Sequence, residues 1–299
     1  MKKGTVVVLG AGGQVGSMIV QNLTEKNVIP KAVIRNKSKE DKLRKSGAEV
    51  CICDLFDATA LEKAISDATS LFVLTPENPF SQNPLLDTEK ILTNIYNAVK
   101  TSSIKKIVGL SSGGAHLKAG SGNLLMSRML EDTFVDLNIR QTFIRPAYYY
   151  SNWIGYLDMV KENGILPTFY PPNFQIQMVA PADVAQYIAD VLCSENNCEG
   201  IYEVIGSQPY SSNDIANAFG NLLNKDVAVS EITPDLWGKT LQSIGFSPMA
   251  TQLMIEMTDC VIKGKTASDL DENNLVRMGT TFDEYLRDYQ KNICAANFS

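Results

Sequence analysis

Seven residues near the start of the chain, from Gly10 to Gly16, could hold a pyrophosphate. They read Gly-Ala-Gly-Gly-Gln-Val-Gly, with a glycine at every third position. The first glycine suits a tight turn out of a strand, the central pair lets a phosphate approach the backbone, and the last lets a helix pack closely. The helix start adds free N–H groups and partial positive charge. We expect dinucleotide binding here rather than a turn used only for close packing. The expected phosphate-binding residues are Gly10, Gly12, Gly13, Gln14, Val15 and Gly16.

A single cation follows the second predicted strand and bears on which dinucleotide binds. That strand ends at Arg35, and no acid appears before Glu40. Sites that prefer NAD(H) usually place an acid here for the adenosine ribose, whereas a 2′-phosphate needs a cation. Arginine suits a phosphate because its planar fork makes paired hydrogen bonds. We therefore expect NADP(H), with NAD(H) as the alternative, while a solvated charge run is the other explanation of Arg35.

Asp54, at the end of the third predicted strand, has two interpretations that stay open. Its carboxylate could reach the adenine edge of a dinucleotide. It could equally be a turn residue or a helix N-cap, for which aspartate is well suited.

The elements that must position these residues alternate along the first half of the chain. Apolar runs at 6–9, 31–35, 49–53, 71–74, 107–110 and 141–144 predict strands. Helical spacing covers 14–26, 39–46, 57–65, 85–102 and 124–137. Strands that are apolar throughout are buried on both faces, which indicates a parallel sheet between helices. The sequence predicts an α/β fold with a doubly wound parallel sheet of the Rossmann type.

The second half of the chain is less regular. Aromatic residues lead into a helix after residue 150, and the proline-rich range 167–172 is expected to be an ordered loop or lid. A helix at 182–192 and a strand at 202–205 return to the sheet, and residues from 211 onward are expected to be mainly helical. We predict a dinucleotide-binding domain at 1–150. Residues 151–299 are expected to rejoin the sheet and form a smaller helical lobe over its carboxyl edge.

Several short motifs together resemble the NmrA-like branch of the atypical short-chain dehydrogenases. They are the glycine turn, Arg35, Ser111-Ser112-Gly113, Ile144-Arg145-Pro146-Ala147 followed by aromatics, the run 179–185 and the run 281–286. The resemblance covers nearly the whole chain. It implies NAD(P)H-dependent reductases, including quinone reductases, or non-catalytic sensors that bind NADP(H) and control a partner protein. The further residues expected to contact the cofactor are Leu55, Thr75, Ser111, Arg128 and Pro146.

The proton-donating pair of typical short-chain dehydrogenases is missing. That pair is Tyr-x-x-x-Lys, which puts both side chains on one helical face. By the family pattern, Leu124 stands at the tyrosine position and Arg128 at the lysine position. Arginine can bond a ribose but cannot relay a proton. The literal match at Tyr96 and Lys100 lies on the preceding helix, whose end faces the amino edge of the sheet, so we interpret it as structural.

Other side chains could replace the missing acid. His116 follows the fifth predicted strand and could protonate or orient a substrate oxygen; a surface or capping role is the alternative. Tyr148 is a second candidate, so the expected catalytic residues are His116, Arg128 and Tyr148. Aromatic packing between lobes would explain the tyrosines equally well. The expected substrate pocket consists of Ser112, Tyr148, Tyr150, Asn152 and Trp153.

The composition excludes several function classes. The 299 residues carry a formal net charge of −6, which disfavours direct nucleic-acid binding. Six scattered cysteines and one histidine form no zinc pattern, and reduced thiols favour a cytoplasmic protein. No run is long enough for a membrane span, and the apolar run after Lys3 is too short for a secretion signal. We expect a monomer or homodimer.

Two functions follow from these residues. The first is an NADPH-dependent reductase of a quinone or similar small planar acceptor. Quinone reduction needs less acid help than ketone reduction because the product anion is delocalised. The second is a redox sensor in which NADP(H) alters affinity for a protein partner. The absent Tyr and Lys favour the sensor, and the aromatic segment favours the reductase.

Overall fold

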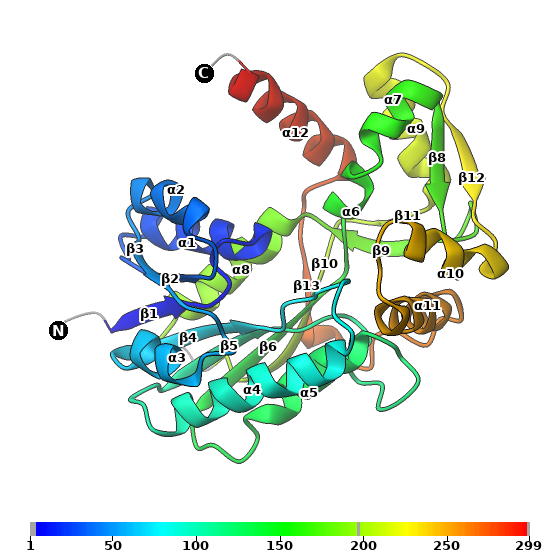
Figure 1. Cartoon of the computed structure of the whole chain (residues 1–299). Coiled ribbons are helices and arrows are strands. Elements are labelled where there is room, and N and C mark those ends of the chain that lie inside the picture. Colours follow the sequence, from blue (N-terminus) through cyan, green and yellow to red (C-terminus); the bar gives the residue numbers. More distant parts are fainter. Residues whose placement is uncertain (1–3, 196–197, 298–299) are drawn as a thin grey trace.

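The computed structural model describes residues 4–195 and 198–297 (Figure 1). Within them, one parallel sheet has eight strands, and two smaller sheets lie in a separate lobe. The strands of the main sheet, in spatial order, are β3 (Glu49–Ile52), β2 (Lys31–Ile34), β1 (Thr5–Val8), β4 (Ala68–Leu74), β5 (Lys106–Leu110), β6 (Arg140–Pro146), β10 (Gly200–Ile205) and β13 (Leu275–Arg277). The order reverses between β1 and β4, which confirms the doubly wound fold and opens a crevice at that point.

Helices cover both faces of this sheet (Figure 1). One face carries α1 (Gln14–Glu25), α2 (Glu40–Lys45) and α8 (Pro181–Cys193). The other carries α3 (Ala58–Ile65), α4 (Pro84–Lys100) and α5 (Leu124–Thr133). Strand side chains alternate between these two cores: Val8 packs with Ile19 on the first, and Val7 with Ile95 on the second. Full burial of each such side chain contributes about 1.5–3 kcal/mol.

Local signals fix where the helices begin. Asp57 caps α3 by accepting a hydrogen bond from the Ala60 N–H, and Asn83 does the same for α4, whose first residue is a proline. In the lobe, Ser211 and Asp214 form a reciprocal capping box at the start of α9. These caps satisfy N–H groups that have no partner within the helix.

The C-terminal lobe stands beside the carboxyl edge of the main sheet (Figure 1). Its helices are α6 (Ser151–Ile154), α7 (Leu157–Asn163), α9 (Ser212–Leu223), α10 (Pro234–Ser243), α11 (Pro248–Ile262) and α12 (Phe282–Asn297). Its small sheets pair β7 (Tyr148–Tyr149) with β9 (Ile176–Val179) and β11 (Pro209–Tyr210), and β8 (Ile165–Thr168) with β12 (Ala228–Glu231). An aromatic core holds the lobe together, with Trp153, Phe219 and Phe282 buried.

The second half follows the sequence-based expectations with additions. The range 167–172 is ordered, one of the two alternatives expected for it, and it begins inside β8, which pairs with β12. Tyr170 is buried, and the Thr168 hydroxyl hydrogen-bonds the Tyr170 backbone, so the segment is anchored in the core. The region after residue 211 also contains β12 and β13, and β13 joins the main sheet beside β10. Residues beyond 150 thus contribute to both sheet and lobe, while the domain boundary at 150 stays a prediction.

Cysteine burial partly matches the expectation of reduced, buried thiols. Cys53 is buried and Cys51 half-buried, and both are free thiols. Burial raises the pKa of the Cys53 thiol to about 11, which makes it a poor nucleophile. The side chain of Cys294 lies outside the described residues.

Candidate cofactor and substrate site

The glycine turn connects β1 to α1 in a conformation that requires glycine. Gly10 has a φ of +64°, which side-chain-bearing residues rarely adopt. A Cβ at Gly16 would stand 2.4 Å from the Gly10 carbonyl oxygen, so the helix start could not pack as closely. The Gly13 N–H donates to the Gly10 carbonyl at 3.0 Å and closes the turn.

The N-terminus of α1 is open to a ligand. Gly13 and Gln14 are exposed, no side chain caps the helix, and its first turn holds no acid. The Val15 side chain is buried in the sheet-facing core, so Val15 can offer a ligand only its backbone. An uncapped helix start of this kind favours an anion through its N–H groups and dipole. The turn therefore fits a pyrophosphate by its donor set.

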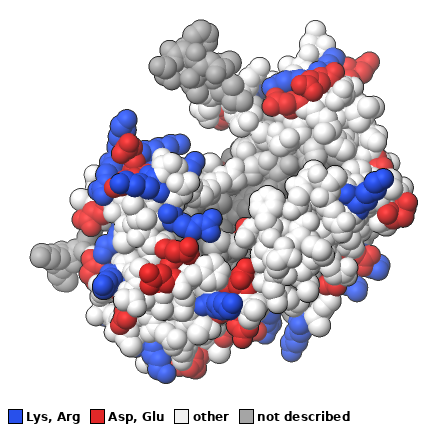
Figure 2. Space-filling view, in the orientation of Figure 1, with Lys and Arg blue, Asp and Glu red and all other residues white. Residues whose placement is uncertain are grey.

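Two cations flank the turn. Arg35 is exposed just beyond β2, and it forms no ion pair with another described residue. Lys39 was not among the residues expected from the sequence, yet its β and γ carbons lie within 3.7 Å of where a Cβ of Gly12 would stand. Lys39 lies in a 3₁₀ turn, Lys37–Lys39, that is capped by Asn36. Figure 2 shows Lys and Arg side chains gathered over this part of the molecule, above α2.

The residues after β3 and β4 that were expected to contact the cofactor differ in their surroundings. Asp54 accepts a hydrogen bond from the Phe56 N–H at 3.1 Å, so it holds a turn, and the capping residue of α3 is Asp57. Leu55 is buried in the core beneath α3 and α4. Thr75 is half-buried directly after β4. Asp54 therefore stabilises a turn, and its contact with adenine stays a prediction.

The first turn of α5 has no acid. Leu124 and Arg128 both lie on α5, as the sequence indicates. Arg128 donates from Nε to Asp132 at 2.6 Å along the same helix. Ser112, at the end of β5, donates to Ser127 at 3.0 Å and so holds this helix against the sheet edge. Both Arg128 and Ser112 are half-buried rather than enclosed.

A buried ionic network lies beneath α5. Arg145 is 2% exposed and pairs through two nitrogens with Glu131, at 2.8 and 2.7 Å. A third nitrogen donates to Asp269 at 2.8 Å. Ser111 donates to Glu131 at 2.6 Å, and His116 Nδ1 lies 3.6 Å from Asp269.

This network changes what we expect of two site residues. The Ser111 hydroxyl donates its hydrogen to Glu131, so it could meet a cofactor only as an acceptor, and its cofactor contact stays a prediction. His116 faces Asp269, which sits in the loop after α11, and its enclosed Nδ1, 3.6 Å from that carboxylate, has no hydrogen-bond partner among the described residues. Its role as a proton donor stays a prediction. Pro146, next to Arg145, is buried at the end of β6.

The tyrosine run after β6 alternates in direction, as an extended segment should. Tyr150 is fully buried, packs on Tyr210 and Phe282, and donates to the Thr280 carbonyl. Trp153 is 2% exposed, and its indole N–H meets the Met178 sulfur. The expectation that both line a substrate pocket is corrected accordingly: they are core residues of the lobe.

Tyr148 and Asn152 are more accessible than Tyr150 and Trp153, and their place in a substrate pocket stays a prediction. Tyr148 is half-buried, Asn152 is exposed, and their side chains hydrogen-bond. Burial raises the pKa of the Tyr148 phenol well above its ordinary value, so it is a weak acid that can still donate a hydrogen bond. Ser151 donates to Gln14 at 3.0 Å, which ties this segment directly to the glycine turn.

The literal Tyr-x-x-x-Lys pair on α4 has a structural role. Tyr96 donates to Asp136 at 2.7 Å, and the Lys100 ammonium lies 5.6 Å from the centre of the Tyr96 ring. Tyr96 packs partly against the core beneath α3 and α4, on the face opposite α1.

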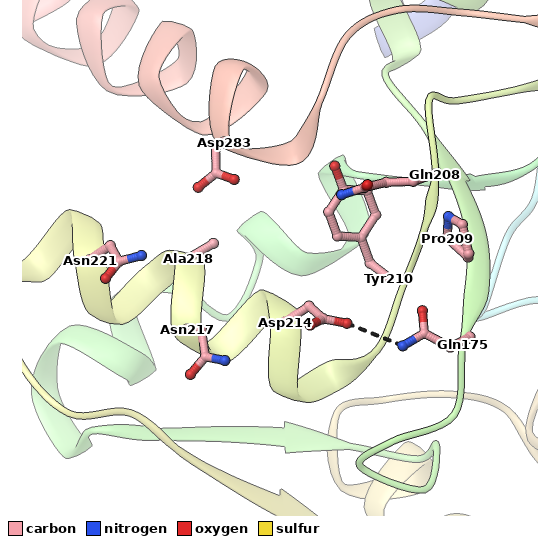
Figure 3. Close-up of a pocket in the computed structure, with 9 residues that line it drawn as sticks. All are labelled: Gln175, Gln208, Pro209, Tyr210, Asp214, Asn217, Ala218, Asn221 and Asp283. Atoms are coloured by element: carbon pink, nitrogen blue, oxygen red, sulfur yellow. Dashed lines mark hydrogen bonds between the residues drawn. The ribbon is translucent and has the colours of Figure 1, made fainter.

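Two hollows differ in the charge of their walls. Figure 2 shows a deep hollow between the lobe and the sheet part that carries α1 and α2. A second hollow, of about 390 Å³, lies between α9 and α12 (Figure 3). Asp214, Asn217, Asn221 and Asp283 line it, and Gln175 donates to Asp214 at 3.3 Å. It has no cationic lining residue, so the hollow beside the glycine turn suits phosphates better.

Residues 4–195 and 198–297 contain neither a metal-binding cluster nor a membrane-spanning helix. No group of three or more His, Cys, Asp or Glu side chains there could hold a metal ion. In the same ranges, no helix combines the length and apolar character needed to cross a membrane.

Comparison with known proteins identifies the family. The model of the NmrA-like family matches residues 2–286. The chain belongs to the NmrA-like family. Among curated relatives of this NmrA-like protein, an NAD(P)H azoreductase from Xenophilus azovorans is 24% identical over 257 residues, covering 84% of this chain and 85% of the relative. A (4-alkanoyl-5-oxo-2,5-dihydrofuran-3-yl)methyl phosphate reductase from Streptomyces griseus is 20% identical over 267 residues, covering 88% and 89%.

Solved structures share the fold of the NmrA-like chain. An NADPH-dependent quinone oxidoreductase from Escherichia coli, complexed with NADPH, aligns with a TM-score of 0.79 at 22% identity, covering 95% of this chain and 99% of that one. Triphenylmethane reductase from Citrobacter sp. aligns with a TM-score of 0.79 at 21% identity, covering 97% and 100%. At these identities the likeness establishes the architecture.

Proposed function

We propose that this NmrA-like protein is an NADPH-dependent reductase of a small planar acceptor such as a quinone. The observation that carries the proposal is the uncapped start of α1 behind the glycine turn, with Arg35 and Lys39 beside it. Backbone N–H groups suit the pyrophosphate, and the two cations suit a 2′-phosphate. The names of the two curated relatives, both reductases, support the same class of activity.

The chemistry of the proposed reaction divides between cofactor and protein. When bound, the reduced nicotinamide supplies a hydride. The protein positions the acceptor, and Tyr148 and Asn152 are the polar groups we place beside it. The absence of a tyrosine acid on α5 favours acceptors whose reduced form is a stabilised anion. The same absence also fits a sensor that binds NADP(H) without turning over an acceptor, and the turnover experiment below separates the two functions.

The cofactor half of the proposal is tested by measuring NADPH and NADH affinity in Arg35→Ala and Lys39→Ala. A hydrogen bond to a charged group contributes about 1.5–3 kcal/mol, so Arg35→Ala should weaken NADPH binding by about 10- to 150-fold. NADH should change by less than about threefold. Lys45→Ala, an exposed lysine at the end of α2, is the matched control. Equal losses for the two dinucleotides in Arg35→Ala would reject the NADP(H) assignment.

The reductase half is tested by NADPH oxidation with a panel of quinones, azo dyes and triphenylmethane dyes. Steady turnover with at least one conjugated acceptor is expected. Tight NADPH binding without turnover of any acceptor would refute the reductase and favour the sensor.

A further inference from the structure

An acidic side chain lies where the connection after β4 meets the start of α5. Glu77 is three residues beyond Leu74, the last residue of β4. β4 lies between β1 and β5 in the sheet, and the Leu74 side chain reaches within 2.6 Å of where a Cβ of Gly10 would stand. Glu77 is therefore three residues away from a side chain that packs beside the glycine turn.

The connection that carries Glu77 is fixed against the lobe. The Ser247 N–H, at the start of α11, donates to the Pro79 carbonyl at 2.8 Å, and the Ser247 hydroxyl donates to the Ser81 carbonyl at 2.5 Å. Glu77 thus stands on a segment that runs from β4, at the point where the strand order reverses and α/β sheets bind ligands, to the start of α11 in the lobe.

The partner of Glu77 marks the position of the missing acid. The Asn123 side-chain amide hydrogen-bonds the Glu77 carboxyl, and Asn123 immediately precedes Leu124. Asn123 is held from the other side because its N–H donates to the Leu253 carbonyl of α11 at 3.3 Å. Its side-chain oxygen is enclosed and has no partner among the described residues. The carboxyl group is thereby placed beside the residue that replaces the usual tyrosine.

The surroundings of Glu77 favour its protonated form. Its side chain is exposed, yet protein atoms crowd it enough that desolvation raises the pKa of its carboxyl. The hydrogen bond from Asn123 lowers the pKa in part, and no charged group of the described residues contributes to the shift.

We propose that Glu77 is the proton donor of this reductase and that Asn123 is its positioning residue. The proposal rests on the proposed function. An acceptor such as a quinone takes up a hydride with its electron pair and becomes an anion. The Glu77 O–H bond breaks, an O–H bond forms on the acceptor, and the carboxylate left behind takes a proton from water. In sum, one quinone, one NADPH and one proton become one hydroquinone and one NADP⁺.

Two acceptors with different proton demands test the proposal. A quinone needs a hydride and a proton, whereas a cationic triphenylmethane dye becomes neutral by taking up a hydride alone. General acid catalysis contributes about 100-fold or more, so Glu77→Gln should lower the ratio of quinone to dye turnover by at least about tenfold. Glu62→Gln, an exposed glutamate on α3, should leave the ratio unchanged. An unchanged ratio in Glu77→Gln overturns the proposal.

The pH profile gives the same test where the dye is not turned over. An acid must be protonated to act, so quinone turnover by the wild-type protein should fall as pH rises through the pKa of Glu77. That fall should be absent in Glu77→Gln. A wild-type profile that Glu77→Gln leaves intact overturns the proposal.

A readout without turnover completes the test. In protein labelled with ¹³C at the glutamate carboxyl carbon, the signal absent from Glu77→Gln should titrate above the ordinary range of an exposed glutamate. Asn123→Ala should raise its midpoint further, because a hydrogen bond to the charged form is lost. A midpoint in the ordinary glutamate range overturns the proposal. Failure of the wild-type protein to reduce any acceptor instead refutes the proposed function, so the two failures are distinguishable.

Discussion

The glycine turn and the first turn of α5 both follow the carboxyl ends of strands in the same sheet. They differ in whether the residues that a short-chain dehydrogenase needs are present. At the glycine turn the expected groups are present: Gly10 at positive φ, Gly16 packed without a Cβ, and an uncapped helix start. At α5 the positions of the usual acid pair hold Leu124 and Arg128, and Arg128 pairs with Asp132.

This difference has a physical origin. A pyrophosphate is held mainly by backbone N–H groups, so its site requires one backbone path and tolerates few sequences. A proton can be delivered by any side chain of suitable acidity within hydrogen-bond reach, so that role can move to another segment. The α5 region therefore contains the Glu131 side of the Arg145 network but no tyrosine that could donate a proton.

Breaking the Arg145 network should give the largest effect. Arg145→Ala leaves the carboxylate of Glu131 buried and unpaired, which should lower the free energy of unfolding by about 3–5 kcal/mol. Urea unfolding followed by circular dichroism measures this change. Lys263→Ala, which removes an exposed pair with Asp259, is the control and should cost less than about 1 kcal/mol. Similar losses in the two variants would mean that α5 is not held by buried charge.

Substituting the last glycine of the turn should have a smaller but more specific effect. A Cβ at Gly16 would stand 2.4 Å from the Gly10 carbonyl oxygen, and overpacking of this kind costs about 1–3 kcal/mol. Because the clash would displace the backbone of the turn, Gly16→Ala should weaken NADPH binding by about 5- to 150-fold. Fluorescence titration with NADPH gives the affinity. Gly238→Ala on α10, where a Cβ meets only Ile255 at 3.8 Å, should leave binding unchanged. Wild-type affinity in Gly16→Ala would show that the turn does not shape the phosphate site.

The sheet could be predicted from the sequence because strands buried on both faces read as continuous apolar runs. The glycine turn could be predicted because its backbone demands glycine. Lys39 was missed because in the sequence it is one of several neighbouring cations, and only the fold brings it beside Gly12. Tyr150 was misplaced because an extended aromatic run does not reveal which ring faces the core. Glu77 carries no sequence signal, since its hydrogen bond joins segments 46 residues apart.

Restoring the missing pair should give the smallest change. Leu124→Tyr combined with Arg128→Lys recreates Tyr-x-x-x-Lys on α5, yet catalysis requires each group to lie within about 0.5 Å of its productive position. Leu124 packs beside Gly114, where a Cβ would approach its Cδ1 to 2.9 Å, so a phenol placed there would not find a prepared pocket. We therefore expect NADPH oxidation with a simple ketone to rise by no more than about tenfold over wild type, below the range of a positioned general acid. Arg128→Lys alone, which keeps a cation near Asp132, is the control. A gain of about 100-fold or more in the double variant would contradict the comparison, because it would mean that the α5 end still holds the full geometry of a proton-donating site and lacks only its side chains.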